Sequence, residues 1–348
     1  MIAGDSGQVL TSSNHASKAG VKVTDQPDEG AVRTLRARTI PADAVEALWR
    51  ATDGHEIRRL DWPQEEQASA RGSILFMPGR GDAYEKYLEL FADWHDAGWA
   101  VTAADWRGQA GSGRLGVDPF TGHIEDFNLW VNDLARFWGE WQAQAPAPHV
   151  LVGHSMGGHL ALRAVAERRI APEALVLSAP MLGFTGPKLP EALLHGVARM
   201  MCRTADPRRP AWKWSEKPGE LPVGRQALLT HDDARYADEV WWREQRSEIV
   251  MGPGSWGWVE RAYASMRDLM RPSSLEQVTT PTLILAAQND RLVSYDAIIQ
   301  AAQRLPNAKL VSFGPEARHE VLREVDPVRN RALLAIEQFL DEHASASR

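Results

Sequence analysis

The sequence predicts an α/β fold in which a mostly parallel sheet carries helices on both faces. Short apolar runs recur along the chain, at 73–77, 99–104, 149–152, 174–178, 282–287 and 309–313. Most of them are separated by helix-compatible stretches such as 84–97 and 124–144. Continuous apolar strands that alternate with amphipathic helices are typical of a parallel sheet buried on both sides. The alternation stops once, between about residues 181 and 273, which indicates an insertion.

The beginning of the chain has a different character. Residues 1–38 are rich in Ser, Gly, Asp and Thr and show no periodicity, so we expect a mobile N-terminal extension. Asp53-Gly54 then separates two alternating runs, 48–51 and 57–60. This pattern predicts a β-hairpin. We therefore expect the core of the fold to comprise residues 39–180 and 274–345.

The insertion, residues 181–273, is rich in tryptophan. Its run from Leu189 to Met201 places four apolar side chains on one helical face, namely Leu193, Val197, Met200 and Met201. We predict a helical cap over the carboxyl ends of the strands, where open α/β sheets bind ligands. Its tryptophans either pack the interior of the cap or line a substrate pocket, and we assign the second role to Trp241 and Trp256.

Composition and charge restrict the class of protein. The chain has 348 residues, of which 44% are hydrophobic and 24% charged, so it is expected to be globular. A net charge of -7 with both signs interspersed disfavours a nucleic-acid partner. Cys202 is the only cysteine, which excludes an intrachain disulfide. The first 30 residues lack the apolar segment of a signal peptide, and no stretch approaches the roughly 20 apolar residues of a membrane span. We expect a cytoplasmic protein.

One pentapeptide carries the strongest chemical signal. Gly153-His154-Ser155-Met156-Gly157 lies directly between an apolar run and a helix-like run. It has the form of a nucleophile elbow, in which serine occupies a strained turn between a strand and a helix and its neighbours must be small. Ser155 is therefore the predicted nucleophile. His154 is a rival base, but its position on the tight turn directs its ring away from Ser155, and we assign it to packing.

A serine hydrolase also needs a base and an acid that orients the base. With this elbow the chain order is Ser, then Asp or Glu, then His. Asp290 follows the apolar run 282–287, and His319 follows the run 309–313. Taken alone, Asp290 is equally explained as a helix cap, and His319 as a surface histidine. Three loop positions in the required order predict a catalytic triad of Ser155, Asp290 and His319.

The oxyanion of such a reaction is usually held by backbone N–H groups after an early strand and after the nucleophile. The loop Pro78-Gly79-Arg80-Gly81-Asp82 follows the run 73–77. We therefore predict an oxyanion hole formed by the amides of Arg80 and Met156.

Two other motifs are incomplete. The loop after residue 77 lacks the third glycine of a dinucleotide-binding motif because Tyr84 stands there. The segment from His319 to Arg323 lacks the second histidine of a zinc-protease helix, which Arg323 replaces. We predict neither a cofactor nor a metal.

Taken together, five blocks resemble the monoacylglycerol lipase and lysophospholipase L2 group of α/β-hydrolases. They are Pro78 to Asp82 with Tyr87, Asp105 to Gly113, Gly153 to Gly158, Asn289-Asp290, and Ala317 to Glu320. The resemblance runs from about residue 45 to 342 and implies an α/β-hydrolase fold with an inserted helical cap. It also implies the triad and the two oxyanion amides named above. Family members often have histidine where Pro78 and Gln109 stand, so the resemblance leaves open whether acyl-glycerol substrates are retained.

These observations predict a serine hydrolase that cleaves carboxylic esters, of lysophospholipid or monoacylglycerol type, through an acyl-enzyme. The partner is then a small, lipid-like ester, and transient contact with a membrane surface is compatible with it. One alternative is an amidase or aminopeptidase of the same fold, with a substrate amine held by acidic cap residues, which are Asp232, Asp233, Asp238 and Glu239. A solvated helical face explains these acids equally well. The other alternative is a non-catalytic relative whose cap binds a partner or a hydrophobic ligand.

Overall fold

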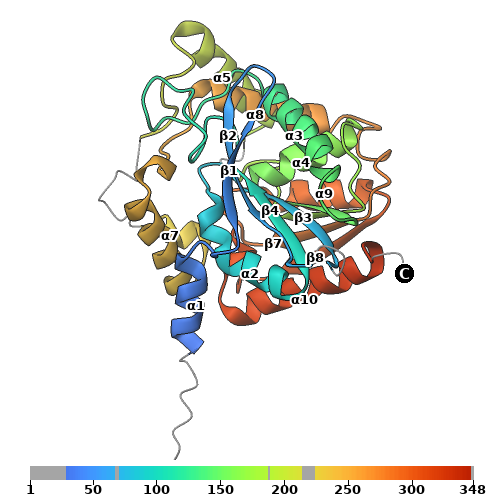
Figure 1. The fold of residues 1–348 in the computed structure, drawn as a ribbon. Helices are drawn as coiled ribbons and strands as arrows, with labels where there is room; N and C mark the ends of the chain where they lie inside the picture. The colour runs from blue at the N-terminus through green and yellow to red at the C-terminus, as the bar shows by residue number, and fades with distance from the viewer. Residues whose placement is uncertain (1–28, 67–69, 187–188, 214–223, 346–348) are drawn as a thin grey trace, which may run out of the picture.

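The computed structural model describes residues 29–66, 70–186, 189–213 and 224–345, and its centre is an eight-stranded sheet (Figure 1). The strand order is β1-β2-β4-β3-β5-β6-β7-β8. The strands are β1 (Val45–Arg50), β2 (Glu56–Trp62), β3 (Gly72–Met77), β4 (Trp99–Ala104), β5 (His149–His154), β6 (Ala174–Ser178), β7 (Thr282–Ala287) and β8 (Ala308–Phe313). The strands β4, β3, β5, β6, β7 and β8, in this order across the sheet, each pair in parallel with the next, which confirms the predicted mostly parallel sheet.

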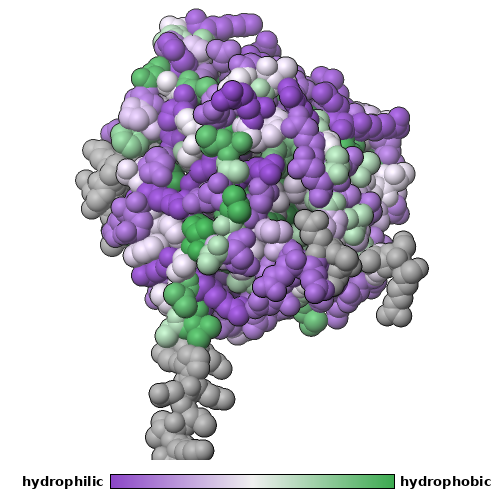
Figure 2. Space-filling model, viewed as in Figure 1, coloured by the Kyte–Doolittle hydropathy of each residue, from purple (hydrophilic) through white to green (hydrophobic). Residues whose placement is uncertain are grey.

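The hairpin predicted near Asp53-Gly54 is present as β1 and β2. The two strands pair antiparallel, with Trp49 opposite Ile57, and Gly54 has a φ of +85° in the turn between them. β1 is an edge strand whose Glu46 and Arg50 are exposed, and charged side chains protect such edges from pairing with other chains. Figure 2 shows a broken line of hydrophobic residues over the β1 and α1 region of an otherwise largely hydrophilic face.

Helices cover both faces of the sheet. One face packs against α3 (Phe127–Gln142), α4 (Met156–Ala166) and α9 (Tyr295–Arg304), and the other against α2 (Leu88–Asp96) and α10 (Asp326–His343). Neighbouring residues of β3 show why: Leu75 belongs to the first core cluster and Phe76 to the second, because successive side chains of a strand point to opposite faces. The short helices η2 (Tyr84–Tyr87) and η4 (Val321–Arg323) lie in loops after β3 and β8.

The described part of the chain between β6 and β7 combines helices with irregular segments. It contains α5 (Glu191–Thr204), α6 (Gln226–Leu229), α7 (Asp233–Gln245), η3 (Ser247–Ile249) and α8 (Trp256–Leu269). α5 packs on α8 at the top of Figure 1, whereas α7 lies to the left beside α1. Within α5, His195 and Ala198 are buried, but Leu193, Val197 and Met200 are exposed. Three members of the predicted apolar stripe therefore face outward, and the fourth, Met201, is half-buried. None of the described helices is long and apolar enough to cross a membrane.

The N-terminal prediction was wrong for residues 29–38, which form the helix α1 (Glu29–Arg38). Arg33 and Arg38 each donate a hydrogen bond of 2.7 Å to the carboxylate of Asp238 on α7, and the indole of Trp242 donates to the Ala37 carbonyl at 2.8 Å. Contacts with residues about 200 positions away hold this helix, so local periodicity does not reveal it. The rest of the predicted extension, residues 1–28, lies outside the described residues.

Candidate active site

Ser155 occupies the turn between β5 and α4 with φ 53° and ψ -117°. Such a positive φ is rare for a residue with a side chain and is characteristic of strained functional turns. A Cβ on Gly157 would lie 2.3 Å from the Met77 carbonyl oxygen, and one on Gly153 would lie 2.7 Å from the Gly158 Cα. The backbone around Ser155 is therefore too close for any side chain at these two glycines, as the pentapeptide predicts.

Asp290 and His319 meet at the ends of β7 and β8. The Nδ1 atom of His319 lies 2.6 Å from Oδ2 of Asp290, and both side chains are buried. Oδ1 of Asp290 accepts hydrogen bonds from the amides of Leu292 and Val293 at 2.7 and 3.0 Å. The cap of the following helix, α9, is Ser294. Asp290 is therefore not the helix cap, which was its alternative explanation, and both of its oxygens are engaged.

Asp290 and His319 each stabilise the charged form of the other. Burial lowers the pKa of His319, but the carboxylates of Asp290, Glu320 and Asp82 together outweigh burial, and the pKa is raised above its usual value. Burial raises the pKa of Asp290, but His319 and the amides of Leu292 and Val293 together outweigh burial, and the pKa is lowered. The pair thus favours an ionised Asp290 beside a histidine that readily accepts a proton. The hydrogen bond to Asp290 also leaves Nε2 of His319 as the nitrogen available for other partners.

Ser155 and His319 line one cavity of about 570 Å³. Within the described part of the chain, no hydrogen bond joins the two side chains. Catalytic hydrogen bonds are often long in a protein without substrate and shorten in the complex. The positions are therefore compatible with a nucleophile and base that engage once a substrate is bound.

The loop that carries Arg80 lies against the serine. A Cβ on Gly79 would lie 3.2 Å from the Cβ of Ser155. Met156 is the first residue of α4, and N–H groups of a first helical turn have no partner within their helix. The side chain of Gln109 connects the two parts, because it accepts a hydrogen bond from the Gly81 amide at 2.8 Å and its Nε2 lies 3.9 Å from Sδ of Met156. Sequence analysis identified Gln109 as a departure from the family pattern. It did not predict that the Gln109 side chain lies between the Arg80 loop and Met156.

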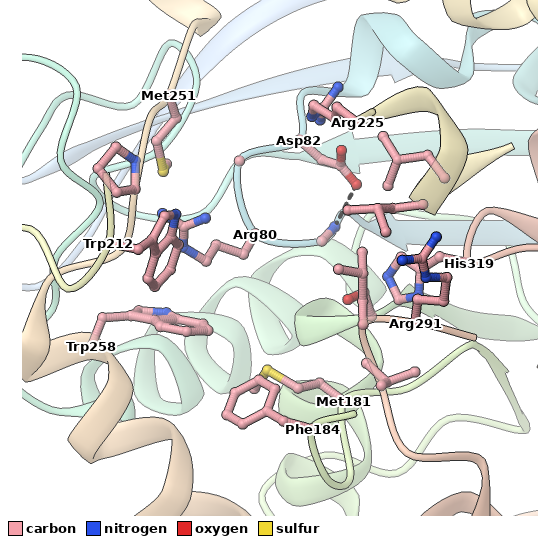
Figure 3. A pocket seen from close by; sticks show the side chains of 18 of the residues that line it. Arg80, Asp82, Met181, Phe184, Trp212, Arg225, Met251, Trp258, Arg291 and His319 are labelled. Atoms are coloured by element: carbon pink, nitrogen blue, oxygen red, sulfur yellow. Dashed lines mark hydrogen bonds between the residues drawn. The ribbon is translucent and has the colours of Figure 1, made fainter. Parts of the chain in front are cut away.

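One part of the remaining cavity wall is apolar, and the charged side chains Asp82, Arg225, Arg291 and Glu320 line another part (Figure 3). Met181 and Phe184 lie on one side, and Trp212 and Trp258 on another, across the cavity from His319. The Arg80 guanidinium stacks on both tryptophans at 5.1 Å from each ring centroid and donates a hydrogen bond of 2.7 Å to the Gly252 carbonyl. This wall suits a hydrocarbon chain better than a strongly polar group.

The two tryptophans selected from the sequence lie in different places. Trp256 lines the cavity, but Trp241 does not, so a pocket-lining role for Trp241 is wrong. Trp241 lies in a separate surface depression, with the Arg38 guanidinium 5.6 Å from its ring centroid. Tertiary packing determines which face of a helix turns toward a cavity, and a single sequence does not contain that information. Trp212 and Trp258, which do line the cavity, could not be distinguished for the same reason.

The chain is similar to several known proteins. The sequence model of a family described as serine aminopeptidase, S33, matches residues 68–326. Lysophospholipase L2 of Escherichia coli is 31% identical over 291 residues, which cover 79% of this chain and 82% of that protein. The probable lysophospholipase L2 of Haemophilus influenzae is 25% identical over 282 residues, covering 79% and 85%.

The fold also has solved counterparts. The crystal structure of a soluble variant of monoglyceride lipase from Saccharomyces cerevisiae, in complex with a substrate analogue, superposes with a TM-score of 0.70. The superposition covers 88% of this chain and 97% of that one at 19% sequence identity. At this identity the likeness concerns the fold, and it confirms the predicted α/β-hydrolase architecture.

Proposed function

Because the chain belongs to the serine aminopeptidase S33 family of α/β-hydrolases, in its monoacylglycerol lipase and lysophospholipase group, we propose that it hydrolyses lipid-like esters with Ser155 as nucleophile. The membership makes it a carboxylic ester hydrolase. The residues that act and the substrate that they cleave are our proposal. The observation that carries it is the buried His319–Asp290 pair on the same cavity as a serine in a strained turn.

The proposed reaction is a two-step acyl transfer. Nε2 of His319 takes the hydroxyl proton of Ser155 as Oγ attacks the carbonyl carbon of the ester. The amides of Arg80 and Met156 hold the negative oxygen of the tetrahedral intermediate. The C–O bond to the alcohol then breaks, and His319 gives its proton to the departing alcohol. Water loses a proton to His319, attacks the acyl-enzyme, and releases the acid as the proton returns to Ser155. Asp290 holds the imidazole in the required tautomer and stabilises its charged form.

For the substrate we propose a single long acyl chain on a polar alcohol, as in a lysophospholipid or a monoacylglycerol. The apolar wall formed by Met181, Phe184 and Trp258 supports the acyl chain, since burial of each methylene contributes about 0.8 kcal/mol. The names of the relatives support both alcohols: a lysophospholipase in Escherichia coli and a monoglyceride lipase in Saccharomyces cerevisiae.

An aminopeptidase is less well supported, although the family description names one. Such an enzyme needs acidic groups that hold the substrate amine. The four acidic residues of the α7 region do not line the cavity and are engaged elsewhere: Asp232 with Arg235, Asp233 with Gln226, Asp238 with Arg33 and Arg38, and Glu239 with Arg225. Asp82 and Glu320, which do line the cavity, are both bonded to Lys86, so an ester is favoured over an amine-bearing peptide.

We further propose that α5 makes transient contact with lipid surfaces. Leu193, Val197 and Met200 are 53%, 41% and 55% exposed on its outward face, and Arg199 and Arg203 are exposed on the same helix. A helix that combines an exposed apolar stripe with cationic side chains is typical of interfacial binding to anionic lipid. A lipid-hydrolysing enzyme would meet its substrate at such a surface.

Covalent labelling tests the proposed nucleophile. A fluorophosphonate probe should label the native protein at Ser155, and Ser155→Ala should abolish the labelling while the far-UV circular dichroism stays unchanged. Hydrolysis of p-nitrophenyl esters should disappear together with the label. A folded protein that neither reacts with the probe nor hydrolyses any ester would instead be the non-catalytic relative.

A further inference from the structure

A buried cluster of six charged side chains lies next to His319, and the proposed reaction does not use it. Its members are Asp82, Lys86, Arg225, Glu239, Glu320 and Arg323. Three are carboxylates and three are cations, so the formal charges of these six balance, and the half-buried Arg243 lies 3.8 Å from Oε1 of Glu239 at the edge of the cluster. The six come from separate parts of the chain: the loop after β3, η2, the segment before α6, α7, and the segment from Glu320 through η4. Each of the six side chains is at most 12% exposed.

Lys86 lies at the centre of this cluster. Its Nζ donates hydrogen bonds to Asp82, at 2.6 Å, and to Glu320, and lies 3.2 Å from Oε2 of Glu239. Arg323 likewise pairs with Glu320 and lies 3.3 Å from Oε2 of Glu239. Two buried cations thus connect Glu239, on α7, to the residue that directly follows His319.

Lys86 also occupies a position at which a metal ion could otherwise bind. Ligand atoms of Asp82, His154 and Glu320 lie within 4.8 Å of one another, which is compatible with a metal ion. The ammonium of Lys86 is already bonded to both carboxylates, so the position of a cation between them is filled by the chain itself. Burial raises the pKa of Asp82, but its charged neighbours, Lys86 first among them, together outweigh burial and lower the pKa to about 2, which keeps the carboxylate ionised.

Two members of the cluster, Glu320 and Asp82, are connected to His319. Glu320 is its neighbour in the chain, and Asp82 reaches it through His154, whose Nε2 lies 3.9 Å from Oδ2 of Asp82 and whose ring centroid lies 4.8 Å from that of His319. Burial lowers the pKa of His154 to about 4, so His154 is a neutral packing group at working pH. Besides Asp290, Asp82 and Glu320 are the carboxylates that raise the pKa of His319. On the solvent side, the exposed Arg291 lines the same cavity.

We infer that Lys86 and Glu239 are positioning residues for His319, which together keep the buried charge beside it balanced and fix its loop beneath α7. The inference rests on the proposed role of His319 as base. A buried carboxylate without its cation is strongly unfavourable, so loss of Lys86 forces Asp82 and Glu320 to move or to draw in water. α7 is then part of the support of the active site rather than a piece of a movable lid.

Because the cluster contains both carboxylates and cations, substitutions in it should shift the pKa of His319 in opposite directions. Lys86→Met removes one positive charge from the cluster and should raise the pKa of His319, whereas Glu239→Gln removes one negative charge and should lower that pKa. At distances of several ångströms and an effective dielectric constant near 20, each shift is on the order of one pH unit. The double variant restores the native sum of charges and should return the pKa of His319 toward the native value. A role in packing alone predicts no such opposite shifts.

The pKa is measured directly, by NMR titration of the His319 ring in protein labelled at histidine, so the result does not depend on activity. The matched control is Glu244→Gln, the same substitution at an exposed position of α7, which should leave the pKa unchanged. If the proposed function fails, the fluorophosphonate label is absent from Ser155 whatever the titrations give. If the inference fails, the label is present but the pKa of His319 moves in the same direction, or not at all, in the two single variants.

A kinetic measurement tests the positioning role. Each single variant should lower kcat by roughly 10- to 100-fold with a smaller change in KM, because small displacements of a catalytic group act on turnover. Lys86→Met is the variant most at risk of misfolding, and circular dichroism will show whether it folds. If it does not, Glu239→Gln alone decides: an unchanged kcat together with an unchanged pKa of His319 overturns the inference.

Discussion

Truncation of one cavity tryptophan should change which chain lengths the enzyme prefers. Trp256 and Trp241 are both half-buried and both belong to the inserted helices, but only Trp256 lines the cavity that contains Ser155. Trp256→Ala therefore removes part of the wall against which an acyl chain packs. Trp241→Ala removes the same number of atoms from a surface depression elsewhere, so it serves as the matched control.

The size of the effect follows from the apolar contact that is lost. Trp256 forms one part of a wall in a cavity of about 570 Å³, and we expect its indole to cover about two methylenes of a bound chain. At about 0.8 kcal/mol per buried methylene, the loss is about 1.6 kcal/mol, or about 15-fold in kcat/KM. A butyrate ester extends only a few atoms from Ser155 and should lose little. The ratio of kcat/KM for laurate over butyrate is therefore the quantity that changes.

The assay is a series of p-nitrophenyl esters from acetate to laurate, measured below the concentration at which the long esters form micelles. Trp256→Ala should flatten the rise of kcat/KM with chain length, and Trp241→Ala should leave the rise as in the native enzyme. Equal losses on butyrate and laurate in Trp256→Ala, or the same flattening in both variants, would refute an acyl-binding wall at Trp256. A lower melting temperature in one variant would not affect this test. Loss of folded enzyme lowers the rates on butyrate and laurate equally, so it leaves the ratio of their kcat/KM values unchanged.

Four further predictions concern the proposed catalytic residues and the outward face of α5. Ser155→Ala should lower turnover by on the order of 10⁴ to 10⁶, and residual hydrolysis near the native rate would exclude it as nucleophile. The kcat/KM of the native enzyme should rise with pH through a value above 6.5, because Asp290 raises the pKa of His319 and only the neutral imidazole acts as base. Asp290→Asn should lower turnover by on the order of 10³ to 10⁴ and move this rise to lower pH, and an unmoved rise would contradict the assignment. Leu193→Ser should weaken sedimentation with anionic phospholipid vesicles, whereas Leu334→Ser, at a comparably exposed position of α10, should not.

The sheet and the site loops were predictable because a buried parallel sheet leaves a strong local signal. Each strand is a short apolar run, and the residues after the carboxyl ends of such strands meet at one edge of the sheet. Ser155, Asp290 and His319 each follow one of these runs. Their order in the chain was therefore enough to predict that Asp290 lies beside His319. It was also enough to predict that His319 and Ser155 line the same cavity. That they act as a triad stays a prediction until Ser155 is labelled.

The features that escaped prediction depend on contacts between distant segments. α1 is held by Asp238 and Trp242, about 200 residues further along the chain. The cluster around Lys86 draws its members from several segments, and each member alone resembles an ordinary charged surface residue. Trp241 and Trp256 lie on different helices, and only the tertiary packing of those helices determines which one faces the cavity.

The inserted segment has two parts with different attachments, and this difference decides how substrate would reach Ser155. α7 is tied to the His319 loop through Glu239 and to α1 through Asp238, so its displacement would expose buried charges. α5 instead packs on α8, carries its apolar face outward, and leads into the stretch that contains Trp212, which is 44% exposed and lines the cavity. Substrate taken from a lipid surface would therefore pass beside Trp212 rather than beneath α7. On this reasoning, substitutions on the outward face of α5 slow the hydrolysis of lipids held in vesicles but leave soluble p-nitrophenyl esters unaffected, whereas substitutions at Glu239 slow both.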